Sequence, residues 1–94
     1  SQAELVELIG LTRDRWVKAD AVDELAARHA RDSASVISSL LRDSDREVRR
    51  AAAEALAELG AEDQVASLAS ATAAESDRAV RSVMKSALVE LQGR

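Results

Sequence analysis

The chain has 94 residues, a formal net charge of −4, no cysteine, no proline and a single aromatic residue, a tryptophan. These values exclude disulfides, thiolate metal sites and a cysteine nucleophile, and the acidic balance disfavours nucleic acid as a partner. No apolar run approaches the ~20 residues that span a bilayer, so we expect no membrane contact and a cytoplasmic protein. The excess of Arg over Lys, with much Ala and Asp, is typical of GC-rich bacteria.

Apolar residues recur at spacings of three and four along almost the whole chain, which predicts helices and leaves no strand candidate. Helices are expected at about residues 2–10, 14–30, a third ending near 41, 46–59, 62–72 and 77–91. Gly60 is expected to end the fourth helix in the left-handed conformation. Candidate N-caps are Asp32 or Ser33 for the third helix, Ser44 or Asp45 for the fourth, and Ser76 for the sixth.

The helices repeat in pairs. A shift of 31 residues aligns the fourth helix with the second, and a shift of 32 aligns it with the sixth. Matching positions include Val17, Val48 and Val80. Three units of this kind, at about 2–31, 32–61 and 62–92, would stack into one domain covering residues 1–94. Because the chain begins with Ser1, we also considered that it is cut from a longer protein.

The middle unit carries a recognisable pattern, formed by Asp43, Asp45, Val48, Arg49, Ala52, Ala55, Leu56, Leu59 and Gly60. It resembles the HEAT-like repeat of the phycobilisome-lyase type, which reads Asp-Pro-Asp-Pro-x-Val-Arg and continues with Ala and Leu at helical spacing. The resemblance implies an all-α fold, a short right-handed α-solenoid of three helix pairs. Ser44 and Arg46 replace the family's prolines, and the first unit has Thr12 and Lys18 in place of the acid and the arginine.

In proteins of this type, the arginine that follows the acid by six residues reaches acids in the turns of its own and neighbouring units, which forms a ladder between repeats. The resemblance therefore implies a structural ladder in which Asp43 pairs with Arg49 and Glu75 pairs with Arg81. Arginine suits this role because its planar guanidinium bonds two groups at once. Acid–base catalysis would require a pocket and a carboxylate of perturbed pKa, which the sequence does not indicate.

Other reactive residues have ordinary explanations. His29 is the only histidine and lies near a helix C-terminus, where the helix dipole favours a cation, with Asp32 nearby as a capping acid. Glu54 and Glu58 form an acidic pair on a solvated helix face. We therefore expect no catalytic residues, no metal site and no cofactor.

Trp16 stands outside the repeating core positions. It is interpreted either as a plug that closes the open end of the first unit, which we favour, or as a binding anchor. The exposed ridge of the second helices is the expected partner-binding surface, and its charge is mixed. Its candidate residues are Trp16, Asp23, Glu47, Arg50, Glu54 and Lys85.

The sequence thus favours a non-catalytic interaction module that binds a protein or peptide on its concave face. One alternative is a bilin-lyase-like, chromophore-handling activity, and a second is a glycosylase-type DNA-binding protein, both raised by the resemblance. A homodimer, or packing against missing repeats, would use apolar residues at the two ends. These are Leu5, Leu8 and Ile9 at one end and Val83, Val89 and Leu91 at the other.

Overall fold

The computed structural model describes residues 1–93, and over that range the chain forms helices and no strand. The expected all-α, solenoid-like fold is confirmed. No helix in this range is long and apolar enough to cross a membrane. The α-helices are α1 (Gln2–Leu11), α2 (Arg15–Ala27), α3 (Ala34–Ser39), α4 (Arg46–Leu59), α5 (Val65–Ala74) and α6 (Arg78–Gln92). Short 3₁₀ helices, η1 (Arg31–Ser33), η2 (Leu40–Arg42) and η3 (Glu62–Gln64), flank α3 and precede α5.

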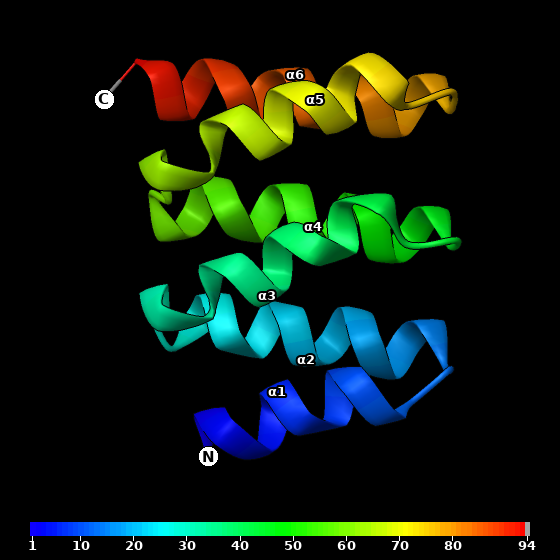
Figure 1. The fold of residues 1–94 in the computed structure, drawn as a ribbon, viewed down its shortest axis with the longest axis vertical. Coiled ribbons are helices and arrows are strands. Elements are labelled where there is room, and N and C mark those ends of the chain that lie inside the picture. Colours follow the sequence, from blue (N-terminus) through cyan, green and yellow to red (C-terminus); the bar gives the residue numbers. More distant parts are fainter. Residues whose placement is uncertain (94) are drawn as a thin grey trace.

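The helices form two layers (Figure 1). The second helices of the three pairs, α2, α4 and α6, lie side by side, and α4 contacts both of its neighbours extensively. The first helices, α1, α3 and α5, form the other layer and pack against α2, α4 and α6 respectively. The molecule measures 30 × 27 × 16 Å, and its short dimension corresponds to these two layers.

The core is one continuous cluster centred on α4. Val48, Ala52, Ala53 and Leu56 are completely buried there, and four further positions of α4 are nearly so. Most of the buried residues of α4 are alanines. Because alanine adds only a methyl group to the helix surface, α4 can pack closely against helices on both sides.

The helix starts differ in part from the sequence prediction. Asp45 caps α4, as one of the two alternatives proposed, but Asp77 rather than Ser76 caps α6. Ser33 occupies the N-cap position of α3, but neither its side chain nor that of Asp32 makes the expected capping hydrogen bond, because η1 leads directly into that helix. The hydroxyl of Ser33 is instead buried and accepts a hydrogen bond from Gln2 Nε2 at 3.0 Å, which joins the first two units.

Gly60 and His29 occupy equivalent helix ends. Gly60 follows α4 with φ of 64°, as predicted, and the N–H of the next residue donates to Leu56. His29, 31 residues earlier, has φ of 55°, and the following N–H donates to Leu25 in the same way. Both residues therefore supply the left-handed position of a Schellman helix end, and only Gly60 does so without steric cost.

Candidate functional site

The three second helices begin in the same kind of turn. Asp14, Asp45 and Asp77 are their N-caps, and each carboxylate accepts hydrogen bonds from backbone N–H groups of the first turn. An aspartate satisfies N–H groups that the helix itself leaves without partners. Each turn thus places a carboxylate at a helix N-terminus, where the helix dipole stabilises negative charge.

A second polar side chain lies two residues before each cap. Thr12, Asp43 and Glu75 accept a hydrogen bond from the backbone N–H of the following cap residue, at 3.1, 3.0 and 3.0 Å respectively. This bond closes the turn in all three units. The threonine in the first unit performs the same local role as the two acids, but it brings no charge.

These acids form an inner ladder of ion pairs with the preceding unit. Lys18 Nζ lies 2.9 Å from Asp43 Oδ1, and Arg49 Nε lies 2.7 Å from Glu75 Oε1. Arg49 also donates from Nη2 to Glu75 Oε2 at 3.1 Å, so this contact is bidentate. Both carboxylates are largely shielded from water, with Glu75 buried to 7% exposure.

The structure has the expected contact between an arginine and an acid of the neighbouring unit, but the two candidate pairs six residues apart do not form. Arg49 does not bond the carboxylate of Asp43; its Nη1 donates instead to the backbone carbonyl of Asp43 at 3.0 Å. Glu75 pairs with Arg49 and not with Arg81. The cation therefore binds its own turn through main-chain oxygen and reaches forward to the carboxylate of the next unit, which ties two units together.

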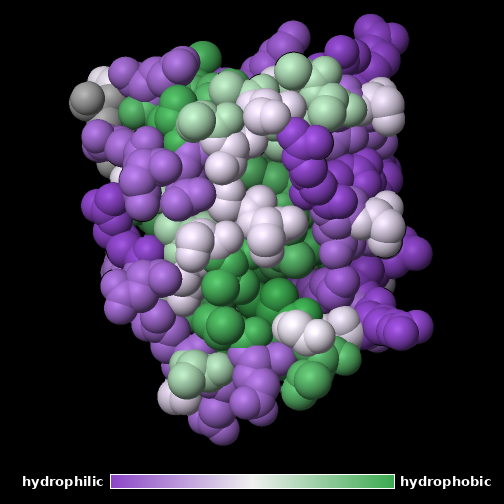
Figure 2. Space-filling view, viewed as in Figure 1, coloured by the Kyte–Doolittle hydropathy of each residue, from purple (hydrophilic) through white to green (hydrophobic). Residues whose placement is uncertain are grey.

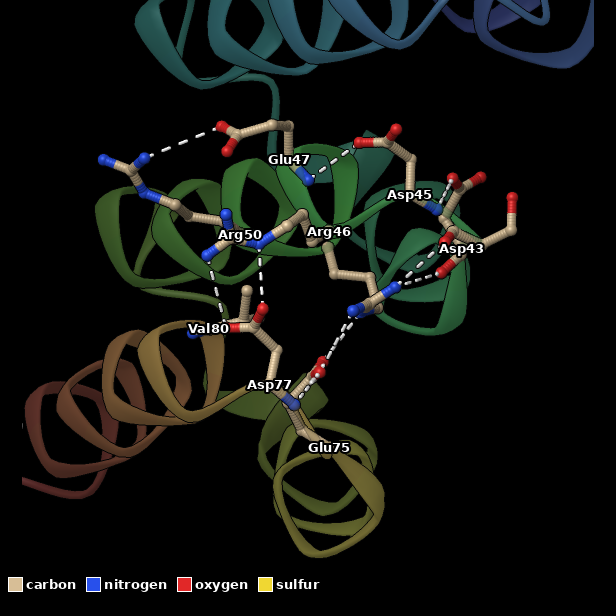
Figure 3. Close-up of polar contacts among 10 residues, drawn as sticks. Asp43, Asp45, Arg46, Glu47, Arg50, Glu75, Asp77 and Val80 are labelled. Atoms are coloured by element: carbon tan, nitrogen blue, oxygen red, sulfur yellow. Dashed lines mark hydrogen bonds and ion pairs between the residues drawn. The ribbon is translucent and has the colours of Figure 1, made fainter.

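An outer set of ion pairs, the outer ladder, also joins the units and was not predicted; Figure 3 shows one of these pairs, between Arg46 and Asp77. Arg15 Nε lies 3.0 Å from Asp45 Oδ2, and Arg46 Nε lies 2.9 Å from Asp77 Oδ2. Both arginines are about half exposed, so water screens these pairs and each contributes little to stability. The signal was present in the sequence, because Arg15, Arg46 and Arg78 recur with the same shifts as the core residues.

The electrostatics of the inner ladder favour charged carboxylates. Desolvation alone would raise the pKa of Glu75, but the hydrogen bonds from Arg49 and from the N–H of Asp77 outweigh it and lower that pKa. The pKa of Asp43 is lowered in the same manner, desolvation being outweighed by bonds from Lys18 and the N–H of Asp45. A general acid needs the opposite shift, so these groups are suited to structural ion pairs.

At the C-terminal end the two ladders stop at unpaired cations. Arg78 and Arg81 occupy the positions of Arg46 and Arg49, and neither side chain bonds to any residue of the range 1–93. Arg78, Arg81, Ser82 and Lys85 line a shallow surface hollow of about 340 Å³. Lys85 is exposed here, at the end of the stack.

The predicted ridge residues of α4 bond mainly to one another. Arg50 lies 3.6 Å from Glu47 and 3.8 Å from Glu54, both within α4. Glu47 also leans toward α2 (Figure 3) and is only partly exposed. Arg50 and Glu54 are exposed. Such pairs within one exposed helix are weak, so these side chains remain available to a partner.

A groove lies between α4 and α6, with a volume of about 700 Å³. Its floor is apolar and includes Ala57, Val83 and Ala87, while its rim carries Glu54, Glu58 and Glu90. Val89, which is 70% exposed, also lines it. The groove therefore combines exposed apolar surface with three carboxylates.

The acidic rim continues onto α2. Desolvation raises the pKa of Asp23, and the negative charges of Glu54, Asp20 and Glu58 raise it further. Part of this pKa shift therefore comes from repulsion between neighbouring carboxylates along the ridge, and the nearby Arg50 opposes it. A cation from a partner would relieve that repulsion.

Trp16 does not close the end of the first unit. Its side chain is 59% exposed at the start of α2 and is not part of the buried core. The structure therefore does not support the interpretation of Trp16 as a plug. An exposed indole on a protein of this size is available for contact with a partner. Its role as a binding anchor stays a prediction.

Sequence reasoning missed a second surface, on the layer of first helices (Figure 2). In the view of Figure 1, weakly polar and apolar residues run along the middle of this face, between hydrophilic flanks. A hollow of about 650 Å³ between α3 and α5 is lined mostly by small residues, with Arg42 bonded to Ser70 at 2.7 Å. The available signal was the lack of any charge between residues 65 and 74.

His29 and the acids form no metal site. Residues 1–93 contain no group of three or more His, Cys, Asp or Glu side chains placed to hold an ion. His29 is exposed, and its conformation at the end of α2 accounts for its position in the structure. Within the same range, every buried side-chain nitrogen or oxygen has a hydrogen-bond partner.

Three stacked helix pairs, joined by ladders with a period of 31 or 32 residues, define an α-solenoid. The family model of HEAT repeats matches residues 3–89, and the chain belongs to that family. The comparison with curated proteins and that with solved structures gave no match. HEAT repeats in general mediate protein interactions. The further resemblance to the phycobilisome-lyase type stays a resemblance.

Proposed function

We propose that this chain is a non-catalytic protein-binding module whose partner lies along the ridge of α2, α4 and α6. The observation that supports it is the groove between α4 and α6, in which an apolar floor is bordered by Glu54, Glu58 and Glu90. Protein-recognition surfaces combine apolar anchoring sites with a polar rim in this way.

The chemistry of the groove specifies the kind of partner. Its carboxylates would pair with Lys or Arg, and its floor would accept Leu, Ile or Met side chains. An amphipathic helix with a basic flank presents both on one face. A phosphate backbone would instead be repelled by the rim and by the acids around Asp23.

The test is a titration followed by two-dimensional amide NMR. The probe is an amphipathic helical peptide of Leu and Lys, and a matched peptide with Glu in place of Lys serves as the comparison. We expect the basic peptide to shift amide signals of residues 54–58 and 82–90 selectively, with weaker binding at higher salt. The acidic peptide should leave the spectrum unchanged.

A charge-reversed variant provides the second part of the test. Glu54→Lys with Glu58→Lys should weaken peptide binding by about tenfold or more, because attraction becomes repulsion. The matched control, Glu62→Lys with Asp63→Lys, makes the same change in net charge in η3, outside the groove, and should bind almost as wild type does. Equal binding by both variants, or shifts spread over the whole chain, would contradict the proposal.

A further inference from the structure

The two ends of the stack carry opposite charges at positions that are buried in its middle. In α4, Ala53 and Ala57 continue the helix stripe that begins with Arg46 and Arg49, the residues that pair with the following unit. Both alanines are buried, at 0% and 6% exposure. This stripe is therefore the side of α4 that packs against α6.

On α6 the residues of the same stripe are exposed or partly exposed, and the last of them, Val89, also borders the groove between α4 and α6. The residues equivalent to Ala53 and Ala57, by the 32-residue shift, are Lys85 and Val89, and both are exposed. The cations Arg78 and Arg81 lie on the same stripe without a partner among the described residues. The C-terminal end thus presents three cations around one exposed valine.

The N-terminal end has the complementary pattern. Ala51 and Ala55 of α4 are buried, at 6% and 3% exposure, and their equivalents on α2 by the 31-residue shift are the exposed acids Asp20 and Glu24. Of the two, Glu24 also pairs with the exposed Arg28 at 3.0 Å, so Asp20 is the acid without an ion pair within residues 1–93. Asp14 is the equivalent of Asp45, which pairs with Arg15 of the preceding unit. Within residues 1–93, the carboxylate of Asp14 accepts hydrogen bonds only from the backbone N–H groups of Trp16 and Val17 in its own helix.

If the stack is continued by one more helix pair with the same spacing, the C-terminal end of one copy meets the N-terminal end of another. We propose that the C-terminal end docks head to tail onto the N-terminal end of a second copy of this chain. Arg78 would meet the partner's Asp14 as Arg46 meets Asp77, and Lys85 would lie beside the partner's Asp20 and Glu24. Trp16, which occupies the register of the partly buried Glu47, would become covered.

Like-end pairing is disfavoured by the same charges, since it would place Arg78, Arg81 and Lys85 against themselves. Two of the apolar end residues named from the sequence, Ile9 and Leu91, are buried in their own units and are not available for such a contact. Leu8 and Val89 are the exposed members of those sets. A head-to-tail contact does not close on itself, so association should continue beyond a dimer.

Thr12 limits the strength of this contact. It occupies the position of Asp43 and Glu75, so Arg81 would find a hydroxyl where Arg49 finds a carboxylate. Association should therefore be weak and sensitive to salt. Thr12→Asp would complete the inner ladder, and we expect it to tighten association about two- to fivefold, a gain that Arg81→Ala should remove.

The experiment is sedimentation velocity on the 94-residue chain at low salt over a range of concentrations, together with the fluorescence of Trp16. Because Trp16 is the only aromatic residue, its emission reports the N-terminal end alone. The wild type should show an average mass that rises with concentration and a blue shift of emission, both reversed by 0.5 M salt.

Two charge-reversed chains make the test specific. The first carries Asp20→Lys and Glu24→Lys, and the second carries Arg78→Glu and Lys85→Glu. Each alone should be monomeric, because its two ends then have the same sign, and an equimolar mixture should associate again. The control with Glu62→Lys and Asp63→Lys should behave as the wild type, and circular dichroism should show that all chains fold.

Head-to-tail docking requires that reversal at either end abolishes association. A wild type that stays monomeric at millimolar concentration overturns the proposal. So does association that survives reversal at one end, or a mixture of the two reversed chains that remains monomeric.

Discussion

The polar side chains at the turns of this protein act in two ways: they bond to backbone N–H groups, and they form ion pairs with other side chains. Glu75 combines both: its carboxylate accepts two hydrogen bonds from Arg49 and one from the N–H of Asp77. Its burial would be costly without these donors. Among the turn residues, we therefore expect substitution of Glu75 to lower the free energy of unfolding most.

Glu75→Gln should lower the free energy of unfolding by about 2 kcal/mol at neutral pH, since it replaces bonds to a charged acceptor. The pKa of Glu75 is lowered in the folded state, so the unfolded chain takes up the proton first as pH falls. The wild type should lose this stability as pH falls from about 4.5 through the lowered folded value, and the variant should lose less. Urea unfolding between pH 7 and pH 2.5 measures both slopes.

The control for that experiment is Glu62→Gln, an exposed glutamate of η3. It should change the free energy of unfolding little at any pH. A Glu75→Gln chain with the same pH dependence as the wild type would show that Glu75 does not carry the effect.

His29→Gly should stabilise the protein by up to about 1 kcal/mol. His29 has φ of 55°, where side chains other than glycine are strained, and part of the gain is offset by the greater freedom of glycine in the unfolded chain. Gly60→Ala, at φ of 64°, makes the opposite change and should destabilise by about 1 to 2 kcal/mol. Urea unfolding of the two variants gives both signs, and a destabilising His29→Gly would contradict the reasoning.

At the scale of elements, each second helix starts from a cap that also serves as a ladder acid. Asp45 accepts the N–H of Glu47 at 2.8 Å while its other carboxylate oxygen lies 3.0 Å from Arg15. The same residue thus begins α4 and attaches it to α2. Helix start and helix stacking are coupled in this way.

Substitutions at Asp45 should separate the two roles. Asp45→Asn keeps a capping oxygen and removes the charge, so it should cost at most about 1 kcal/mol. Asp45→Ala removes both and should cost about 1 to 2 kcal/mol, with the difference between the two assigned to the cap. Thermal unfolding in low and high salt checks this, because only the ion-pair part should fall with salt. Equal losses in the two variants would argue against a capping role.

At the scale of the whole molecule, the burial of a residue depends on which helix pair it belongs to as well as on its position within the repeat. Ala53 and Lys85 are equivalent in the repeat, yet the first is fully buried between α4 and α6 and the second is exposed at the end of the stack. This difference in burial comes from the tertiary arrangement alone. Substitutions at the two sites should therefore differ in their effect on stability.

Ala53→Met should destabilise the protein by about 1 to 3 kcal/mol, because the close packing of α4 leaves no room for a longer side chain. Lys85→Met at the equivalent end position should change the stability of the monomer by less than about 0.5 kcal/mol. Urea unfolding at low protein concentration, where association is absent, provides the comparison. A tolerated Ala53→Met would mean that the helices can separate without cost.

The sequence by itself determined the helical class, the period of 31 or 32 residues, the core of α4 and the helix end at Gly60. These follow from local rules, since helix period and glycine conformation depend on neighbours close in the chain. Even the caps at Asp45 and Asp77 lie within one residue of the expected positions.

Only the tertiary structure decided which charges meet. For Arg49 the family resemblance implied a pair with Asp43 of its own unit, whereas stacking of the units brings Glu75 of the next unit within 2.7 Å. The exposure of Trp16 and the contrast between Ala53 and Lys85 were decided in the same way. The physical reason is that ion pairing and burial depend on how far apart neighbouring helix pairs lie in the stack. That distance cannot be derived from the pattern of residues along the chain.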